Sequence, residues 1–250
     1  MTQFVTSKDG VRIAYDSTGE GRPIVLIHGF ASSREQNWRT PGWIDALAAA
    51  GFRAVSFDCR GHGKSDKPHD PDLYGENMID DILAVMDAAD AWPADVMGYS
   101  MGGMLTIRLL MKFPERVRRA VTAGIGATYF SEAPAWRAMI AKAVETDNVE
   151  AIEDRAARRF RIFAGQKGKD RAALAACMRS PRRKYSAEEL GHSKRPVLVV
   201  CGEKDDVAGA PEPLANSFHD GSAVTLPGKD HMTAVGDQAY KDAVLQFLGE

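Results

Sequence analysis

The sequence has 250 residues, of which 44% are hydrophobic and 26% charged, a composition that excludes a disordered, collagen-like or coiled-coil chain. Its 32 Lys and Arg against 34 Asp and Glu give a net charge of −2, which favours neither nucleic acid nor an anionic membrane as a partner. Neither a signal peptide nor an apolar run of membrane-spanning length is found. The widely spaced Cys59, Cys177 and Cys201 match neither a disulfide framework nor a CxxC metal motif. We therefore expect a cytoplasmic protein.

Strand-like and helix-like segments alternate along most of the chain. Short apolar or alternating runs predict strands, whereas apolar residues at helical spacing, or runs closed by Gly or Pro, predict helices. The predicted strands cover residues 11–16, 23–28, 53–57, 94–97, 117–123, 196–200 and 223–226. The predicted helices cover residues 43–50, 77–89, 101–113 and 234–247. Repeated βα units with apolar strands predict an α/β fold, with a mostly parallel central sheet flanked by helices.

The alternation stops between residues 131 and 195. Helical patterns at residues 135–145, 149–163 and 171–178 follow one another there without a buried strand. This segment carries a net charge of +6, which leaves −8 for the rest of the chain. We interpret residues 131–195 as a helical insertion on an α/β core formed by residues 1–130 and 196–250. Its basic residues fit a solvated helical face, and a preference for anionic substrates is the alternative.

One motif carries chemistry. Residues 98–102 (GYSMG) lie between a predicted strand and a predicted helix, the context in which a GxSxG string places a serine on a strained turn. The hydroxyl of Ser100 would then project into solvent, at the positive end of the following helix. A glycine-rich turn without chemistry is the alternative. We interpret Ser100 as a nucleophile.

A serine hydroxyl needs a base to act as a nucleophile at neutral pH, and the base needs an orienting acid. His231 follows the last predicted strand, so it is expected at the carboxyl edge of the sheet with Ser100. Asp205 and Asp206 follow the strand at residues 196–200, and either could be the acid. The resulting chain order of serine, acid and histidine differs from the order in two well-known protease folds.

Several segments together resemble the α/β-hydrolase superfamily. Residues 28–30 (HGF) resemble its oxyanion element, and residues 58–65 (DCRGHGKS) resemble its D-x-R-G-x-G-x-S turn. Residues 98–103 (GYSMGG) resemble its nucleophile elbow, and residues 202–205 (GEKD) and 228–231 (GKDH) resemble its acid and histidine loops. The resemblance covers nearly the whole chain and implies the α/β-hydrolase fold with a helical lid, the insertion at residues 131–195.

The resemblance also implies site residues. It implies an oxyanion hole made by the backbone N–H groups of Phe30 and Met101, and its G-x-x-D spacing from Gly202 favours Asp205 over Asp206 as the acid. Three further side chains are candidates for the substrate pocket: Tyr99, Trp38 and Trp136.

These expectations converge on a serine hydrolase, carboxylesterase-like, that cleaves a small ester, thioester or lactone through an acyl-enzyme on Ser100. The same triad serves C–C bond hydrolysis and peracid formation, which remain alternatives. Two further alternatives are a lyase that forms no acyl-enzyme and a non-catalytic ligand-binding receptor of the same fold. We expect a small-molecule substrate, no cofactor and no metal, and the sequence indicates no oligomeric state.

Overall fold

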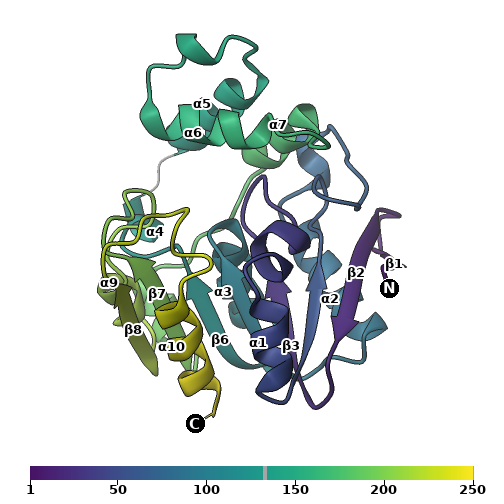
Figure 1. Cartoon of the computed structure of the whole chain (residues 1–250), viewed down its shortest axis with the longest axis vertical. Helices are drawn as coiled ribbons and strands as arrows, with labels where there is room; N and C mark the ends of the chain where they lie inside the picture. Colours follow the sequence, from purple (N-terminus) through teal and green to yellow (C-terminus); the bar gives the residue numbers. More distant parts are fainter. Residues whose placement is uncertain (132–133, 250) are drawn as a thin grey trace.

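The computed structural model describes residues 1–131 and 134–249. Within these residues, eight strands form one sheet in the order β1-β2-β4-β3-β5-β6-β7-β8 (Figure 1). The strands are β1 (Gln3–Thr6), β2 (Arg12–Thr18), β3 (Arg22–Ile27), β4 (Phe52–Phe57), β5 (Ala94–Tyr99), β6 (Val117–Ala123), β7 (Val197–Gly202) and β8 (Gly221–Leu226). Strands β3 to β8 run parallel, and β1 and β2 form an antiparallel edge. The prediction of a mostly parallel sheet is confirmed.

The strand at residues 3–6 was not predicted. All of its residues are exposed or half-buried, so the segment carries none of the apolar run that marks a central strand. It pairs with β2 at the edge of the sheet, where Gln3 lies opposite Tyr15.

Helices cover both faces of the sheet. Outside the segment between β6 and β7 these are α1 (Trp43–Ala49), α2 (Asn77–Ala88), α3 (Met101–Lys112), α9 (Glu212–Ala215) and α10 (Gln238–Gly249), with the short helical turns η1 (Glu35–Arg39), η2 (Pro71–Leu73) and η3 (Pro114–Arg116).

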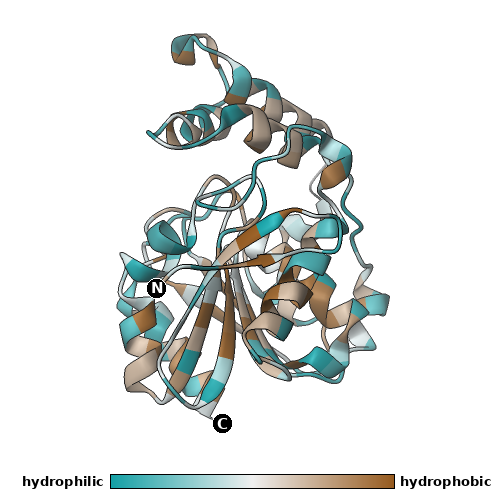
Figure 2. Cartoon of the chain, turned by 90° about the vertical axis from the view of Figure 1, so that its right-hand side faces the viewer, coloured by the Kyte–Doolittle hydropathy of each residue, from teal (hydrophilic) through white to brown (hydrophobic). Residues whose placement is uncertain are grey.

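The apolar side chains of β3 contribute to both hydrophobic layers, one on each face of the sheet. Ile24 and Leu26 pack in the cluster that holds the buried side chains of α1 and α10, whereas Val25 and Ile27 pack in the cluster that holds those of α2 and α3. Successive side chains of a strand point to opposite faces, so a strand covered by helices on both sides must be apolar throughout. The brown strands at the centre of Figure 2 show this pattern along the sheet.

The segment between β6 and β7 is helical, as predicted. It contains α4 (Thr128–Ser131), α5 (Pro134–Glu145), η4 (Val149–Ala151), α6 (Arg155–Ala164), α7 (Arg171–Arg179) and α8 (Ala187–Gly191). Helix α5 packs against α6 and α7, and the three lie above one end of the sheet (Figure 1). We call residues 131–195 the helical insertion; residues 132–133 of it lie outside the described residues.

The predicted helix at residues 149–163 is wrong as a single element. The chain leaves the short turn η4 and starts again at α6, where the carboxylate of Asp154 accepts a hydrogen bond from the N–H of Ala157 at 2.8 Å. An aspartate in this capping position satisfies an N–H group of the first turn that has no partner within the helix. No helix of the described part is long and apolar enough to cross a membrane.

Candidate active site

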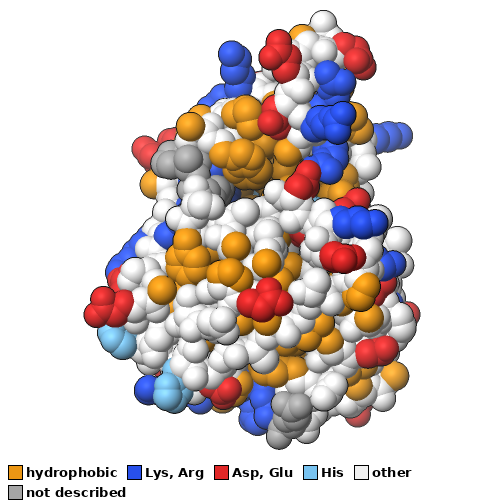
Figure 3. Space-filling view, turned by 90° about the vertical axis from the view of Figure 1, so that its left-hand side faces the viewer, with side chains coloured by type: hydrophobic (Ala, Val, Ile, Leu, Met, Phe, Trp, Pro, Cys, Tyr) orange, Lys and Arg blue, Asp and Glu red, His pale blue; other side chains and the backbone are white. Residues whose placement is uncertain are grey.

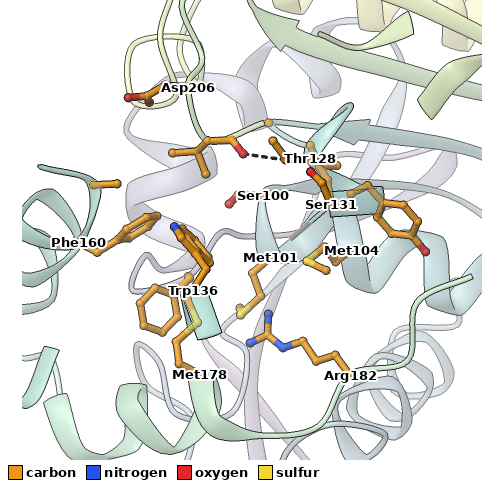
Figure 4. A pocket seen from close by; sticks show the side chains of 16 residues that line it. Ser100, Met101, Met104, Thr128, Ser131, Trp136, Phe160, Met178, Arg182 and Asp206 are labelled. Atoms are coloured by element: carbon orange, nitrogen blue, oxygen red, sulfur yellow. Dashed lines mark hydrogen bonds between the residues drawn. The ribbon is translucent and has the colours of Figure 1, made fainter. Parts of the chain in front are cut away.

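Ser100 occupies the turn that joins β5 to α3. Its backbone has φ 54° and ψ −113°, a strained conformation for a residue with a side chain. The flanking glycines permit this turn, because a Cβ at Gly98 would lie 2.1 Å from the Gly102 oxygen and one at Gly102 would lie 1.9 Å from the Ile27 oxygen. The strained turn directs the Ser100 hydroxyl away from the sheet and into the space beneath the insertion (Figure 4).

The structure brings Ser100, His231 and Asp205 together. The Nε2 atom of His231 lies 3.0 Å from the Ser100 Oγ atom. On the other side of the ring, Nδ1 lies 2.8 Å and 3.0 Å from the two carboxylate oxygens of Asp205. A carboxylate only accepts, so Nδ1 carries the proton and Nε2 is left to accept from the serine hydroxyl. This geometry suits proton transfer from Ser100 to His231.

The two adjacent aspartates have different partners. The carboxylate of Asp205 is buried and also accepts hydrogen bonds from the N–H groups of Val207 at 3.0 Å and Ala208 at 2.8 Å. These bonds fix the carboxylate in the orientation that faces His231. The carboxylate of Asp206 instead accepts two hydrogen bonds from Arg159, at 2.8 Å and 2.9 Å, on the surface. Of the two, Asp205 is therefore the one placed to orient the imidazole.

Tyr99 holds the backbone beneath the imidazole. Its hydroxyl donates a hydrogen bond of 2.7 Å to the carbonyl oxygen of His231. Burial raises the pKa of this hydroxyl well above its usual value of 10, so Tyr99 remains a donor over the whole working pH range. Tyr99, predicted as a pocket residue, therefore also anchors the loop that carries His231.

Two backbone N–H groups next to Ser100 have no protein partner. Within residues 1–131 and 134–249, neither the N–H of Phe30 nor that of Met101 meets a protein acceptor. Met101 is the first residue of α3, where N–H groups lack partners within the helix and the helix dipole favours negative charge. These are the two donors that the resemblance to the α/β-hydrolase superfamily implies for an oxyanion hole.

Two buried histidines hold the loop that carries Phe30. The Nε2 atom of His62 accepts a hydrogen bond of 3.0 Å from the N–H of Ala31, whose φ of 58° is unusual for a residue other than glycine. The Nε2 atom of His28 accepts one of 3.0 Å from the N–H of Cys59. The Nδ1 atoms of both rings donate to backbone carbonyl oxygens, so both imidazoles are neutral. Burial lowers the pKa of each.

The free energy of unfolding is expected to decrease as the pH is lowered below 6.5, and His62 is expected to contribute to this decrease. The unfolded chain binds a proton near pH 6.5, whereas the pKa of buried His62 is well below that value. The stabilisation from its neutral ring is therefore present above pH 6.5 and is lost as the pH falls. The free energy of unfolding of the wild type minus that of His62→Gln is the quantity to compare. We expect this difference to be about 1.4 kcal/mol smaller at pH 5.5 than at pH 7.5, as measured by urea titration.

The matched control is His219→Gln, which removes an exposed imidazole and is expected to follow the wild-type curve. A difference between wild type and His62→Gln that stays constant from pH 7.5 to 5.5 would contradict the prediction.

The turn at residues 58–65 is structural. Asp58 accepts hydrogen bonds from the N–H groups of Arg34 and Lys64, each at 2.9 Å. The buried guanidinium of Arg60 pairs with Asp9 and Asp81, with closest distances of 2.6 Å. The N–H of Ala14 donates to the hydroxyl of Ser65 at 2.9 Å. This network fixes the turn behind the oxyanion loop and leaves none of its side chains facing Ser100.

Two cavities meet at Ser100. The first, of about 380 Å³, extends beneath the insertion and is lined mainly by apolar side chains, including those of Met101, Met104 and Trp136 (Figure 4). The second, of about 350 Å³, contains His231 and Tyr99 and is bordered by polar side chains of residues 32–40. On the outside of the molecule, hydrophobic side chains gather on the insertion just above the core, beside Lys and Arg side chains (Figure 3).

The three predicted pocket residues lie in different places relative to the two cavities. Trp136 lines the first cavity and Tyr99 the second. The prediction for Trp38 is wrong, because its ring is fully buried and packs against Trp43 with 6.1 Å between ring centroids. The turn η1 directs Trp38 into the apolar layer between α1, α10 and the sheet, away from both cavities.

The insertion supplies cavity residues that the sequence did not reveal. Phe160 of α6 lines both cavities, and Met178 and Arg182 line the first. For Phe160 a signal existed, since Ala157 and Ala164 lie on the same side of an amphipathic helix and all three are buried. For Arg182 there was none, because the residue lies in an irregular segment between α7 and α8.

The part of the chain that the structure describes contains no group of three or more His, Cys, Asp or Glu side chains placed to hold a metal ion.

The fold, with Ser100 on a strand-to-helix turn at the carboxyl edge of a mostly parallel sheet, is that of the α/β hydrolases as a class. Comparison with known proteins agrees. The family model described as the alpha/beta hydrolase fold matches residues 22–167, more than half of the sequence. The chain belongs to this alpha/beta hydrolase family.

The relatives include hydrolases of more than one kind. Bifunctional epoxide hydrolase 2 of Sus scrofa is 34% identical over 116 residues, which are 46% of this chain and 20% of that protein. The 2-hydroxymuconate semialdehyde hydrolase of Pseudomonas sp. (strain CF600) is 32% identical over 123 residues, 48% of this chain and 42% of that one. The chain thus matches less than half the length of either. A hydrolase structure from Pseudomonas aeruginosa has a TM-score of 0.83 at 26% identity and covers 100% of this chain and 98% of that chain.

Proposed function

We propose that this protein is a serine hydrolase that cleaves a small ester-type substrate through an acyl-enzyme on Ser100. The observation that carries the proposal is the continuous hydrogen-bonded row of Ser100, His231 and Asp205. It lies beside two N–H groups that meet no protein acceptor within the described residues, those of Phe30 and Met101. A nucleophile, a base with its orienting acid and a pair of oxyanion donors are the groups that acyl transfer requires.

The reaction follows from these positions. His231 takes the proton of the Ser100 hydroxyl as its oxygen attacks the substrate carbonyl. The N–H groups of Phe30 and Met101 stabilise the oxyanion, and the loss of one such donor typically costs about 3 kcal/mol of transition-state stabilisation. His231 then gives its proton to the leaving alcohol, and the same imidazole activates the water that releases the acid. Asp205 keeps the proton of His231 on Nδ1 and stabilises the imidazolium.

The position of His231 assigns a role to each cavity. The imidazole must protonate the leaving group, and it lines the second cavity but not the first. The alcohol part of the substrate therefore belongs in the second cavity and the acyl part in the first. In this proposal the helical insertion acts as a lid that covers both.

Phe160 is expected to limit the length of the acyl group. Its buried ring stands 5.9 Å from that of Phe30 and 6.4 Å from that of His231, measured between centroids, at the boundary of the two cavities. Phe160→Ala would join the cavities. We expect kcat/KM for p-nitrophenyl octanoate, relative to the acetate, to rise about tenfold.

The control for that experiment is Phe163→Ala, because Phe163 lines the second cavity and not the first. It removes a ring of the same size and should leave the acyl-length profile close to that of the wild type. Equal profiles for wild type and Phe160→Ala would contradict the assignment of the first cavity to the acyl group.

C–C bond hydrolysis is the second candidate, favoured by the similarity to the 2-hydroxymuconate semialdehyde hydrolase. In that reaction His231 would protonate a carbon leaving group in place of an alkoxide. The two reactions differ in what the substrate must contain, so a panel of p-nitrophenyl esters and a vinylogous 1,5-diketone separates them. Faster turnover of the diketone than of every ester would favour the second candidate.

The central experiment is detection of the acyl-enzyme. The wild-type protein is expected to react with a fluorophosphonate probe at Ser100, and brief mixing with p-nitrophenyl acetate followed by acid quenching should give a peptide that is 42 Da heavier through acetylation of Ser100. A protein that shows neither modification, although folded, would be a receptor or a lyase rather than a serine hydrolase.

A further inference from the structure

We propose that the acyl part of the natural substrate carries a carboxylate at the end far from the scissile bond, and that Arg182 binds it. This inference rests on the proposed function, because it uses the assignment of the first cavity to the acyl group. It names the substrate class as half-esters, half-thioesters or carboxylated lactones of dicarboxylic acids.

The guanidinium of Arg182 is built into the wall of the first cavity. Arg182 lies between α7 and α8 and is half-buried. Figure 4 shows its side chain extending toward Met101, with the guanidinium end directed into the cavity. The Nη2 atom donates to the carbonyl oxygen of Cys177 at 3.1 Å and lies 3.6 Å from the Cys177 sulfur. That sulfur is itself 3.8 Å from the sulfur of Met101, so Cys177 contacts both the guanidinium and the residue that follows Ser100.

Within the described part of the chain, Arg182 forms no ion pair. Among residues 1–131 and 134–249, no carboxylate lies within 4.0 Å of its guanidinium nitrogens. The neighbouring Arg183, by contrast, is exposed and pairs with Glu189 at 2.7 Å. A charged group in a mainly apolar wall is costly unless it is paired, so the arrangement favours a ligand that brings a negative charge.

The other charged groups around the first cavity do not compete for this ligand. Asp206 lines the opposite end, on the far side of Ser100 in Figure 4, and its carboxylate is occupied by Arg159. Arg137 of α5 donates to the carbonyl oxygens of Met178 and Ser180. Among the described residues that line the cavity, Arg182 is therefore the positively charged one that can meet an anionic acyl end, and the apolar side chains of Met104 and Met178 line the same cavity.

The proposed reaction is an ordinary hydrolysis of the ester, thioester or lactone bond. The bond between the acyl carbon and the leaving oxygen or sulfur breaks, and a bond forms from that carbon to Ser100 Oγ. Water then replaces Ser100, so a half-ester or half-thioester gives a free dicarboxylate and an alcohol or thiol, and a carboxylated lactone gives a single hydroxy-dicarboxylate. The carboxylate at Arg182 takes no part in bond making; it positions the acyl chain through a charge-assisted hydrogen bond.

The test compares three p-nitrophenyl esters of similar length on the wild-type protein: the mono-ester of adipic acid, the neutral hexanoate and the cationic 6-aminohexanoate. Uncatalysed rates are subtracted, because a free carboxylate can attack its own ester. We expect kcat/KM to be roughly 10 to 100 times higher for the adipate mono-ester than for the hexanoate. This preference should shrink as NaCl is raised from 0.05 to 0.5 M, since salt screens the pair.

Variants locate the effect. Arg182→Met is expected to reduce the ratio of the two rates at least tenfold, Arg182→Lys to restore part of it, and Arg182→Glu to shift the preference toward the 6-aminohexanoate. The matched control is Arg183→Met, which removes an adjacent arginine outside both cavities and should keep the wild-type activity and ratio.

A wild-type protein that hydrolyses the hexanoate as fast as the adipate mono-ester would overturn the inference, and this measurement does not depend on any variant folding. A normal preference that persists in Arg182→Met would overturn the role of Arg182. Both results leave the proposed function intact. A protein that cleaves none of the three esters and resists the fluorophosphonate probe would instead refute the proposed function, and this inference with it.

Discussion

Ser100→Ala is expected to hydrolyse p-nitrophenyl esters roughly 10⁴ to 10⁶ times more slowly than the wild type. The reason is that the variant loses the attacking oxygen, whereas the oxyanion donors and both cavities remain. Initial rates on p-nitrophenyl acetate, corrected for the uncatalysed reaction, measure the effect. The same variant should fail to react with a fluorophosphonate probe.

The fold should survive this change. The change removes a hydroxyl that is hydrogen-bonded to His231. The side chain of Ala is smaller than that of Ser, so it fits into the turn at φ 54°. Circular dichroism and thermal unfolding close to those of the wild type therefore show that a loss of rate is chemical. If a folded Ser100→Ala protein retained most of its ester hydrolysis, another residue would be the nucleophile.

Asp205→Asn is expected to lower kcat by about four orders of magnitude, whereas Asp206→Asn should change it by less than about threefold. An amide at position 205 presents an N–H group to Nδ1 of His231 and so favours the tautomer with its proton on Nε2, which cannot accept the proton of the serine. The adjacent Asp206 pairs with Arg159 at one end of the first cavity, so its replacement disturbs an exposed ion pair and leaves the triad in place.

This pair of variants has the same change at neighbouring positions, and each serves as the control for the other. Rates are measured on p-nitrophenyl acetate for both, with thermal unfolding as a check of folding. A large loss in Asp206→Asn with near-normal Asp205→Asn would reverse the assignment of the acid. Equal losses would indicate that the whole loop, rather than one carboxylate, supports His231.

The fold was predictable because its signals are local. The strand pattern at residues 23–28 and the glycine after the helix at residues 43–50 reflect requirements of single segments, and the structure agrees with them to within a few residues. The edge strand β1 was missed because an exposed strand of four residues needs no apolar pattern. Its existence depends on β2 as a partner, which is a property of the assembled sheet.

The candidate site was predictable where backbone topology decides it. Ser100, Asp205 and His231 each follow a strand of the parallel sheet, so the sheet itself brings them to one edge. Trp38 was misplaced because the direction of a side chain in the short turn η1 depends on what packs beside it, here Trp43. The frequent occurrence of Trp in binding sites does not predict where the side chain of a particular Trp points.

The cavity walls could not be read from the sequence for a related reason. Phe160 and Arg182 line the cavity that contains Ser100 because α6 and the segment after α7 are folded back over the sheet edge. That placement depends on contacts between α5, α6 and α7, many residues apart. Helical periodicity identifies the apolar side of α6 but does not say which surface it will cover.

The insertion leaves the core after β6 and returns to it before β7, and these two strands are neighbours in the sheet. Because β6 and β7 run parallel, the insertion leaves the core at the carboxyl edge of the sheet and rejoins it at the amino edge, and none of the three residues of the triad lies between these two points. The triad residues therefore come from the core alone, whereas the cavity walls are shared between the core and the insertion. We expect that exchanging the insertion for another helical segment would replace the part of the cavity wall formed by Trp136, Phe160 and Arg182 and would leave the triad residues in the chain.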